Sequence, residues 1–356
     1  MNPQNKFCIK CGATANSAIH KYCGRCGSEI GTRKQILGPN QYPSANFIFL
    51  NNAKLGVNKW WVWIISILLI LMIWNLVGFV PTWVTCEALS YLSLESFYCE
   101  DYIIIGNSYT PNFIVANAGF VIGLIGIYYV TKILHKKQFT RLFTARRYID
   151  YKRVLFSASI VGSILTVLLI LELSLSDSGI KFQSPGVTEY LLFFLFVLML
   201  TPIQAFMEEV FFRGYLLQGI HLVFRNRLAA ILISSALFTS LHLSNPEPYE
   251  YGFMPYITAI FIMGTFLSLV TIIDGGIEIA TGLHIMNNVW IFLIANTDVS
   301  VLNSPSLFII PIQKYAFLPD IPIQILLNLI VIASVSYTHL RAHETRHDLV
   351  CRLLLE

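Results

Sequence analysis

The sequence contains few charged residues: Lys, Arg, Asp and Glu make up 12% of its 356 residues. A soluble globular protein has about 25%. This shortage, together with 55% hydrophobic residues, excludes a soluble fold and indicates a multi-pass membrane protein. The net charge of +4 is too mild to indicate a nucleic-acid partner. The first 46 residues contain no apolar stretch like that of a cleavable signal peptide, and no internal repeat is evident.

Basic residues are absent from residues 81–112 and concentrated in residues 132–153. The first range holds the acidic residues Glu87, Glu95, Glu100 and Asp101. The second holds Lys132, Lys136, Lys137, Arg141, Arg146, Arg147, Lys152 and Arg153. The positive-inside rule places residues 132–153 in the cytosol, in contact with anionic membrane lipid, and residues 81–112 outside. Cys86 and Cys99 lie in the outer segment, where they form a disulfide or stay as two free thiols.

Apolar runs predict an all-α fold of about eight transmembrane helices in the cell membrane, with both chain ends cytosolic. The predicted spans are Trp60–Val80, Phe113–Val130, Val154–Leu173, 189–220, Leu228–Leu243, Phe253–Ile273, Ile277–Ala295 and Pro322–Ser334. Residues 60–153 comprise the first two spans and the basic loop, and residues 154–334 comprise a membrane core.

A separate unit is expected at residues 1–30, where two Cys-x2-Cys pairs lie eleven residues apart. The four cysteines are Cys8, Cys11, Cys23 and Cys26. Four thiolates at this spacing predict one structural zinc, since a cytosolic segment is reducing and disulfides are the weaker alternative. The unit resembles the zinc ribbons that open many bacterial membrane proteins, and a protein partner is one role for it. Residues 31–59 are polar and irregular and predict a linker.

Residues 335–356 resemble the translation of short-read sequencing adaptors, so we expect this tail to be non-native. It contains His339, His343 and His347 at four-residue spacing. That spacing would otherwise suggest a metal site, and we exclude the tail from the fold prediction.

Glu208 and Glu209 are two adjacent carboxylates in an apolar run of the membrane core, where a charged side chain is energetically unfavourable. A charge at the membrane centre costs about 2.5–3.5 kcal/mol on insertion scales, so such residues commonly serve a function. If the fourth helix continues to Ile220, Glu208 lies about 18 Å above its inner end, at 1.5 Å per residue. His242, His284 and Asn288 fall at similar depths on two other helices. This convergence favours one long fourth helix.

Spacing within the helices separates the two glutamates. Glu209 and Arg213 are four residues apart and can pair on one face, whereas Glu208 is rotated by about 100° and is free for another neighbour. His284 and Asn288 share a face by the same four-residue spacing, as do Phe238 and His242. Close helix approach is expected at the glycines Gly214, Gly264 and Gly282.

Three motifs in order carry a resemblance: Glu208-Glu209-x3-Arg213, Phe238-x3-His242 and His284-x3-Asn288. They resemble the signatures of the CPBP family of intramembrane endopeptidases (CAAX protease or Abi family), over about residues 155–300. The resemblance implies peptide-bond hydrolysis in the bilayer. It implies that Glu208 activates water, which His242 helps to hold. His284 and Asn288 would stabilise the oxyanion, and Glu209 and Arg213 would be structural or assist Glu208.

Other readings of these residues remain open. Glu208, His242 and His284 also make a plausible His2Glu zinc site, although we favour glutamate catalysis without metal. A binding protein, such as a bacteriocin-immunity factor or scaffold, would keep the same residues without catalysis. An ion-coupled transporter is less favoured, because transporters of that kind commonly show internal repeats. The expected substrate is a membrane-inserted or lipidated peptide.

Overall fold

The computed structural model describes residues 45–311, except 93–95, 147 and 176–178, and three short strands nearer the N-terminus. These strands are β1 (Lys6–Cys8), β2 (Thr14–Ala15) and β3 (Ile30–Gly31), which form an antiparallel sheet of order β2-β1-β3. They belong to a compact unit of their own, Met1–Ser44. The following predictions fall outside the described residues: Cys11, Cys23, Cys26, the side chain of Cys8, the eighth span and the tail.

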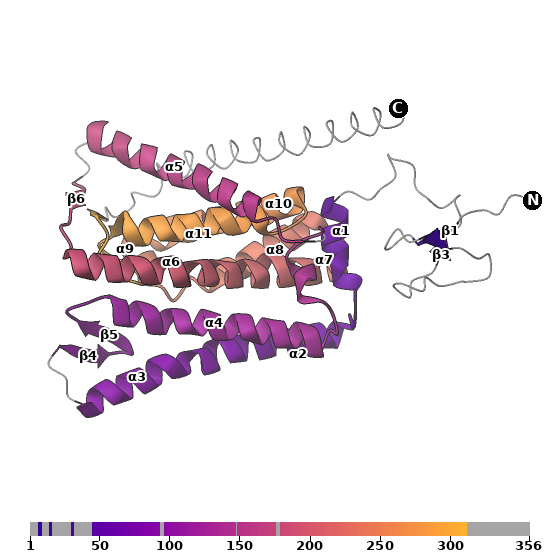
Figure 1. Ribbon diagram of the computed structural model, residues 1–356, viewed down its shortest axis with the longest axis horizontal. Coiled ribbons are helices and arrows are strands. Elements are labelled where there is room, and N and C mark those ends of the chain that lie inside the picture. The colour runs from indigo at the N-terminus through magenta and orange to yellow at the C-terminus, as the bar shows by residue number, and fades with distance from the viewer. Residues whose placement is uncertain are drawn as a thin grey trace, which may run out of the picture. The chain divides into compact units, whose positions relative to one another are not determined.

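Five helical segments of the second unit are long and apolar enough to cross a membrane (Figure 1). They are α2 to α3 (Trp60–Leu92), α4 (Thr110–Ile133), α5 (Tyr151–Leu175), α6 to α7 (Val187–Phe224) and α10 (Phe253–Asp274). The shorter helices α8 (Arg227–Ser240) and α11 (Glu278–Leu293) have 14 and 16 residues. The prediction of an all-α, multi-pass membrane fold is confirmed, but α8 ends before its predicted boundary at Leu243.

The first predicted span does not end at Val80. It continues as α2 (Trp60–Met72), the π-helical turn η4 (Ile73–Val77) and α3 (Gly78–Leu92). Pro81 lies inside α3, and proline cannot donate to the carbonyl four residues earlier. That carbonyl belongs to Val77, the last residue of the π-helical turn, so the lost hydrogen bond falls where the helix geometry already changes.

The fourth predicted span is one long helical segment, as the depth argument required. It comprises α6 (Val187–Glu209), the π-helical segment η6 (Val210–Leu216) and α7 (Leu217–Phe224). Glu208 is therefore sixteen residues above the end of the helix, or about 24 Å at 1.5 Å per residue. The π-helical segment begins directly after Glu209, and such segments often accompany functional sites.

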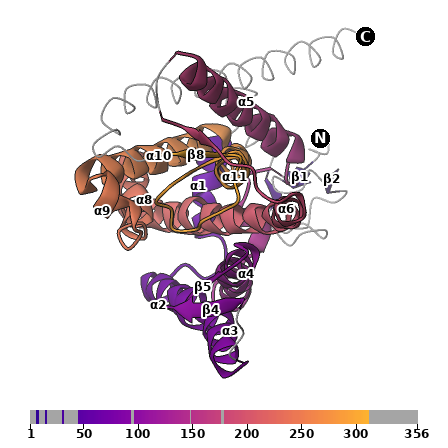
Figure 2. The ribbon, with the colours of Figure 1, turned by 90° about the vertical axis from the view of Figure 1, so that its left-hand side faces the viewer.

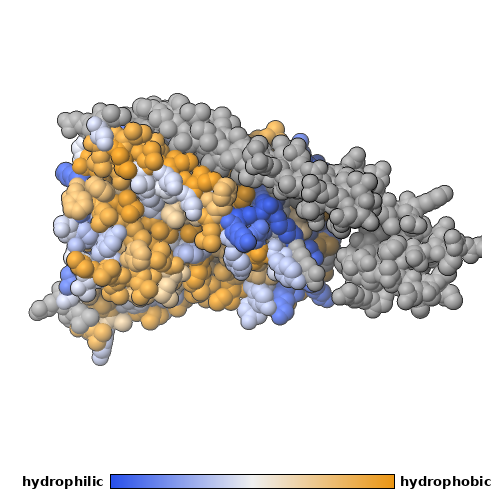
Figure 3. Space-filling view, turned by 45° about the horizontal axis from the view of Figure 1, so that its top comes forward, coloured by the Kyte–Doolittle hydropathy of each residue, from blue (hydrophilic) through white to orange (hydrophobic). Residues whose placement is uncertain are grey.

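The sides of the helices present large apolar residues to the surroundings. Leu68, Leu195 and Met199 are 62%, 53% and 56% exposed, and many other Leu, Ile and Phe side chains are exposed alongside them. Figure 3 shows this as a broad hydrophobic surface on the face in view, with hydrophilic residues gathered toward one end. An apolar exterior of this extent fits lipid and not water. The chain is therefore a membrane protein.

One end of the bundle, here named the acidic end, carries the segment that was predicted to lie outside. The hairpin β4 (Phe97–Glu100) and β5 (Ile103–Gly106) lies there, and Cys99 of β4 forms a disulfide with Cys86 of α3. The same end holds the short helix α9 (Glu247–Tyr251) and a sheet of order β6-β8-β7. Its strands are β6 (Lys181–Phe182), β7 (Ala295–Thr297) and β8 (Phe308–Ile310).

The opposite end, named the basic end, contains a helix inside the segment predicted as a linker. This helix, α1 (Ala45–Asn51), continues into the 3-10 turn Asn52–Lys54. Phe49 and Leu50 are buried in the main core, because this stretch of the polar segment is apolar enough to pack. The side chain of Asn52 donates to the carbonyl of Arg141, within the 3-10 turn Phe139–Leu142, and to the carbonyl of Thr144, just after that turn.

Two of the eight basic residues do not face lipid headgroups freely but bind carboxylates. We name Asp274, Glu278, Arg146 and Arg153 the basic-end cluster. Arg146 binds Asp274 Oδ1 at 2.9 Å and approaches Glu278 Oε2 at 3.4 Å, and Arg153 also binds Asp274 Oδ1. Both carboxylates are buried, while the two arginine side chains are 22% and 28% exposed. This cluster ties the basic loop to the turn between α10 and α11.

The helices that carry the predicted site pack around α6. Seen end on, α2, α3 and α4 form one group beside α6, while α8, α10 and α11 lie on its other side and α5 flanks α11 (Figure 2). Gly282 allows this last contact, because a Cβ there would lie 2.1 Å from the carbonyl oxygen of Val154 in α5. Gly264 likewise lies against α8, whereas Gly214 meets the carbonyl of Leu142 in a 3-10 turn instead of a helix.

Candidate active site

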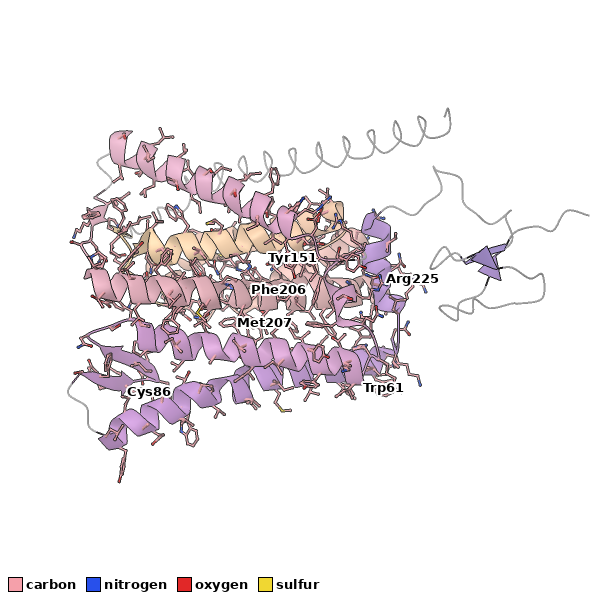
Figure 4. All side chains as sticks on the ribbon, viewed as in Figure 1. Trp61, Cys86, Tyr151, Phe206, Met207 and Arg225 are labelled. Carbon is pink, nitrogen blue, oxygen red and sulfur yellow. A yellow bond between two sulfur atoms is a disulfide. The ribbon has the colours of Figure 1, made fainter. Side chains whose placement is uncertain are left out.

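The two glutamates lie at the last two positions of α6, in the interior of the bundle. Their neighbour Met207 lies about midway between Cys86 at the acidic end and Trp61 and Arg225 at the basic end (Figure 4). Glu209 is fully buried and Glu208 is 7% exposed. A carboxylate this deep needs partners that compensate its charge, and the two glutamates differ in the partners that they have.

Glu209 is held by two side chains through the same oxygen. Arg213 donates to Glu209 Oε1 at 2.9 Å, and His284 Nδ1 lies 2.8 Å from that oxygen. The guanidinium also lies 4.3 Å above the Phe238 ring and donates to the carbonyl of Gly264 at 3.4 Å. The predicted pairing of Glu209 with Arg213 is therefore present. The bond from α11 to Glu209 was not predicted.

That bond fixes how His284 can act. A carboxylate oxygen accepts hydrogen bonds, so the proton of the Nδ1–Glu209 contact belongs to Nδ1. The other ring nitrogen, Nε2, lies 3.8 Å from Glu208 Oε2. His284 thus lies between the two glutamates, bonded to Glu209 and turned toward Glu208. With one proton on the ring, Nε2 accepts a hydrogen bond, and with two protons it donates one.

His242 also has its Nε2 free, because its Nδ1 is bonded to a backbone carbonyl instead of a carboxylate. It lies in the turn just after α8, not within the helix as predicted. Its Nδ1 lies 2.9 Å from the carbonyl oxygen of Phe238, and because a carbonyl only accepts, this nitrogen carries the proton. The ring packs against Phe238 with centroids 4.6 Å apart. Nε2 of His242 is therefore left to act as an acceptor.

A cavity of about 200 Å³ brings the predicted residues together. Its lining includes Glu208, His242, His284 and Asn288 from the three motifs, together with Phe238, Gln204, Asn245, Glu247, Ile260, Met263, Asn287, Ile291, Phe292, Ser300, Val301 and Leu302. Asn288 Oδ1 accepts from Asn287 at 3.1 Å, which leaves the Asn288 amide hydrogens available as donors. Glu209 and Arg213 are not in the lining and contact the site through His284.

The alternative of a catalytic zinc was tested on the positions of its ligands. Among the described residues, no three His, Cys, Asp or Glu side chains are placed so that they could hold one metal ion. Glu208, His242 and His284 border one cavity but do not form such a group in this arrangement. The residues present do not fit the metal, and no catalytic step is derived through one.

Two features of the site could not be read from the motifs. Gln204 lies one turn before Glu208 on α6, and this four-residue spacing was a signal that the motif analysis passed over. Glu247 and Ser300–Leu302 come from the acidic end, where the sequence indicates only polar connecting segments. Their approach to Glu208 depends on how α9 and the loop after β7 fold back over the helices.

Part of the chain is similar to a known protein family. Residues 189–290 match the model of the Rce1-like family, described as type II CAAX prenyl endopeptidase Rce1-like. The chain is 26% identical over 193 residues to the uncharacterized protein YyaK of Bacillus subtilis, covering 53% of this chain and 63% of YyaK. It is also 32% identical over 120 residues to an uncharacterized protein of Mycoplasma capricolum, covering 32% of this chain and 33% of that protein.

The chain thus spans less than two thirds of the length of these two relatives, and no solved structure matches it. The matched range begins within α6 and ends within α11, so it contains all three motifs. It also contains the residues of the three ion-pair contacts, Glu209 with Arg213, Glu209 with His284 and Glu208 with His284. Over residues 189–290 the chain is therefore similar to the Rce1-like family.

Proposed function

We propose that the chain is an intramembrane endopeptidase that hydrolyses a peptide bond of a membrane-embedded or lipidated peptide. One observation carries this proposal: Glu208 borders a cavity and has no arginine or lysine partner among the described residues, whereas its neighbour Glu209 is paired with the buried Arg213. A carboxylate that serves only structure would be paired in the way Glu209 is. The match of residues 189–290 to an endopeptidase family supports the same conclusion.

In the proposed reaction Glu208 acts as general base. It removes a proton from a water molecule in the cavity, and His242 Nε2 accepts the water's second hydrogen bond and so helps to hold it. The oxygen of this water forms a bond to the carbonyl carbon of the substrate peptide. The proton then passes from Glu208 to the leaving nitrogen as the C–N bond breaks, which restores the carboxylate.

The negative charge that develops on the carbonyl oxygen needs donors nearby. Asn288 has free amide hydrogens on the cavity side, and His284 donates from Nε2 when both of its nitrogens carry protons. Glu209 and Arg213 act as positioning residues, because neither lines the cavity: Glu209 holds the ring of His284, and Arg213 holds Glu209 and packs on the ring of Phe238. In the proposed reaction, the groups that exchange protons or hydrogen bonds with the water and the substrate all line the cavity.

We further propose that the basic end faces the cytosol of the cell membrane, following the distribution of Lys and Arg. We also propose that Cys8, Cys11, Cys23 and Cys26 hold one structural zinc, with a protein partner for the ribbon. The three-stranded sheet, in which Cys8 ends β1, is compatible with that site. Zinc content of the purified protein, compared with that of a Cys11→Ser variant, tests it.

The function is tested by replacing Glu208 with glutamine, which keeps the shape and removes the charge. We expect specific membrane peptides to accumulate in cells that carry Glu208→Gln or His242→Ala, as measured by proteomics of the membrane fraction. Glu189→Gln is a matched control, since Glu189 lies at the other end of α6, away from the cavity. Unchanged peptides at equal protein levels would contradict the protease and favour a binding role.

A further inference from the structure

The cavity has a second carboxylate, at the end away from the basic loop, that the proposed reaction does not use. Glu247 is the first residue of α9 and lines the same cavity as Glu208. Its Oε1 accepts a hydrogen bond from the backbone N–H of Val301 at 2.9 Å. This bond holds the loop that contains Ser300 and Leu302 against α9, so Glu247 has a fixed position at the cavity wall.

The other oxygen of Glu247 has no hydrogen-bond partner among the residues that the structure describes. Oε2 is buried from solvent, in contrast to the carboxylate oxygens of an ordinary surface glutamate. A buried acceptor without a partner is unfavourable by about 1–3 kcal/mol, and by more when it is charged. A positively charged donor in the cavity would remove this cost if the Glu247 carboxylate, which lines the cavity, turned to present Oε2 to it.

The cavity lining agrees with a cationic ligand. It contains two carboxylates, Glu208 and Glu247, four side-chain amides, the hydroxyl of Ser300 and two histidines, but no lysine or arginine. Glu208 is engaged in the reaction, whereas Glu247 comes from α9 and the acidic end. A cationic group bound by Glu247 would therefore belong to a part of the substrate close to the scissile bond.

We propose that Glu247 determines specificity by binding a cationic nitrogen of the substrate peptide, either a lysine or arginine side chain or a free amino terminus. The proposal rests on the proposed endopeptidase function and narrows its substrate class to peptides with a basic group beside the cleaved bond. An ion-paired hydrogen bond to the unpartnered Oε2 is the recognition contact. It would be stronger than a neutral hydrogen bond because it is partly shielded from water.

The competing explanation is that Glu247 only fastens the loop to α9. Glu247→Gln separates the two, because glutamine keeps a carbonyl oxygen to accept from Val301 and loses the charge. Glu250→Gln is the matched control, since Glu250 lies on the same short helix, is exposed and does not line the cavity. Equal melting temperatures of both variants would show that the loop contact is intact.

The probes are peptides of leucine and alanine in dodecyl maltoside micelles, which carry one lysine or one norleucine stepped through the central positions. Each is made with a free and with an acetylated amino terminus. The cleavage rate of the lysine peptide by the full-length protein is divided by that of the norleucine peptide. The affinities of the same two peptides for the Glu208→Gln protein give a second ratio. The same two ratios are taken between peptides with a free and with an acetylated amino terminus, which tests the amino terminus as the source of the positive charge.

We expect one of these charged forms to be preferred by about tenfold or more, for binding as well as for cleavage. Adding Glu247→Gln should bring the preference to within about twofold of unity, while Glu250→Gln leaves it in place. Cleavage with no such preference, or a preference unchanged in Glu247→Gln, would overturn the role of Glu247 and leave the protease standing. A binding preference that depends on Glu247, without any cleavage, would support the binding role of Glu247 and contradict only the proposed endopeptidase function.

Discussion

The membrane unit contains two buried ionic clusters with a similar plan but different charge balance. The basic-end cluster has two buried carboxylates, Asp274 and Glu278, and two arginines, of which Arg153 also contacts the exposed Asp150 at 3.3 Å. The site has two carboxylates, Glu208 and Glu209, but one arginine, Arg213. In each cluster one carboxylate is bound by two cationic or ring partners, Asp274 by Arg146 and Arg153 and Glu209 by Arg213 and His284.

The difference lies in the second carboxylate of each cluster. Glu278 lies 3.4 Å from an arginine and the cluster is balanced, whereas Glu208 lies 3.8 Å from a histidine and borders a cavity. A balanced cluster lowers the cost of burial and can serve structure alone. An excess charge beside a space for substrate is available for chemistry. The comparison thus separates a structural from a catalytic use of the same residue types.

The largest expected effect comes from removing the anchored carboxylate of the site. Glu209→Gln leaves Arg213 buried without a charge partner and frees the His284 ring, so it should lower the free energy of unfolding by about 3–5 kcal/mol. Cleavage of the peptides that accumulate in Glu208→Gln cells should fall at least about 100-fold. SDS titration in mixed micelles measures the stability.

Glu208→Gln is the control for Glu209→Gln, because it removes the neighbouring charge without leaving an arginine unpaired. It should abolish cleavage while changing the unfolding free energy by less than about 1 kcal/mol. If the two variants lost equal stability, the assignment of a structural role to Glu209 and a catalytic role to Glu208 would be wrong.

Lys137, at the basic end, is a second buried residue without an ion-pair partner among the described residues. It tests whether a buried charge without a partner is by itself a sign of function. Lys137 is 6% exposed, its Nζ has no hydrogen-bond partner in the described part of the chain, and it lies 5.6 Å from the Trp63 ring centroid. Burial lowers the pKa of Lys137 from 10.5 to about 8. Between pH 8 and 10.5 the unfolded chain therefore binds more protons, so stability rises with pH through this window.

Lys137→Met should accordingly stabilise the protein at pH 7 by up to about 3 kcal/mol, since each pKa unit corresponds to about 1.4 kcal/mol. The gain should shrink as the pH rises through 10.5, because the wild-type lysine then becomes neutral in the unfolded state as well. Thermal unfolding followed by circular dichroism at pH 7, 8.5 and 10 measures it, with exposed Lys136→Met as control. A loss of peptide cleavage in Lys137→Met would give this residue a role that its distance from the cavity does not suggest.

The sequence predicted those parts of the site that depend on spacing within one helix. The pair Glu209 and Arg213 follows from four-residue spacing, and one long fourth helix follows from depth, although it was predicted to reach Ile220 and ends at Phe224. The bond between His284 and Glu209 depends on how α11 is rotated against α6. That rotation is fixed by contacts such as Gly282 against α5, which one sequence does not reveal.

Other features were missed for reasons of local geometry or distance. A π-helical segment adds residues to a turn without changing the apolar pattern, so neither η4 nor η6 was visible. The prediction left open whether Cys86 and Cys99 form a disulfide or stay as free thiols, because the sequence does not show how close their side chains lie. The fourteen-residue length of α8 placed His242 in a turn, although its ring still reaches the predicted cavity.

The anchored carboxylate of the basic-end cluster should matter less than Glu209. Asp274→Asn leaves Arg146 and Arg153 without their shared partner, but both side chains are partly exposed and can be hydrated. We expect a loss of about 2 kcal/mol in the SDS titration. Cleavage per folded molecule should stay within about threefold of wild type, and a larger drop would show that this cluster positions His284 through α11.

The smallest effect is expected for Glu278→Gln, the counterpart of Glu208 in the balanced cluster. Glu278 Oε2 has a long contact with Arg146, and Oε1 is buried without a partner in the described residues. Glutamine keeps an oxygen for Arg146 and brings an amide that costs less to bury than a charge, so stability should change by less than about 1 kcal/mol. Cleavage should persist, whereas Glu208→Gln abolishes it. Loss of cleavage in Glu278→Gln would mean that charge balance does not distinguish the two clusters, because the same change in a balanced cluster would then have the same consequence.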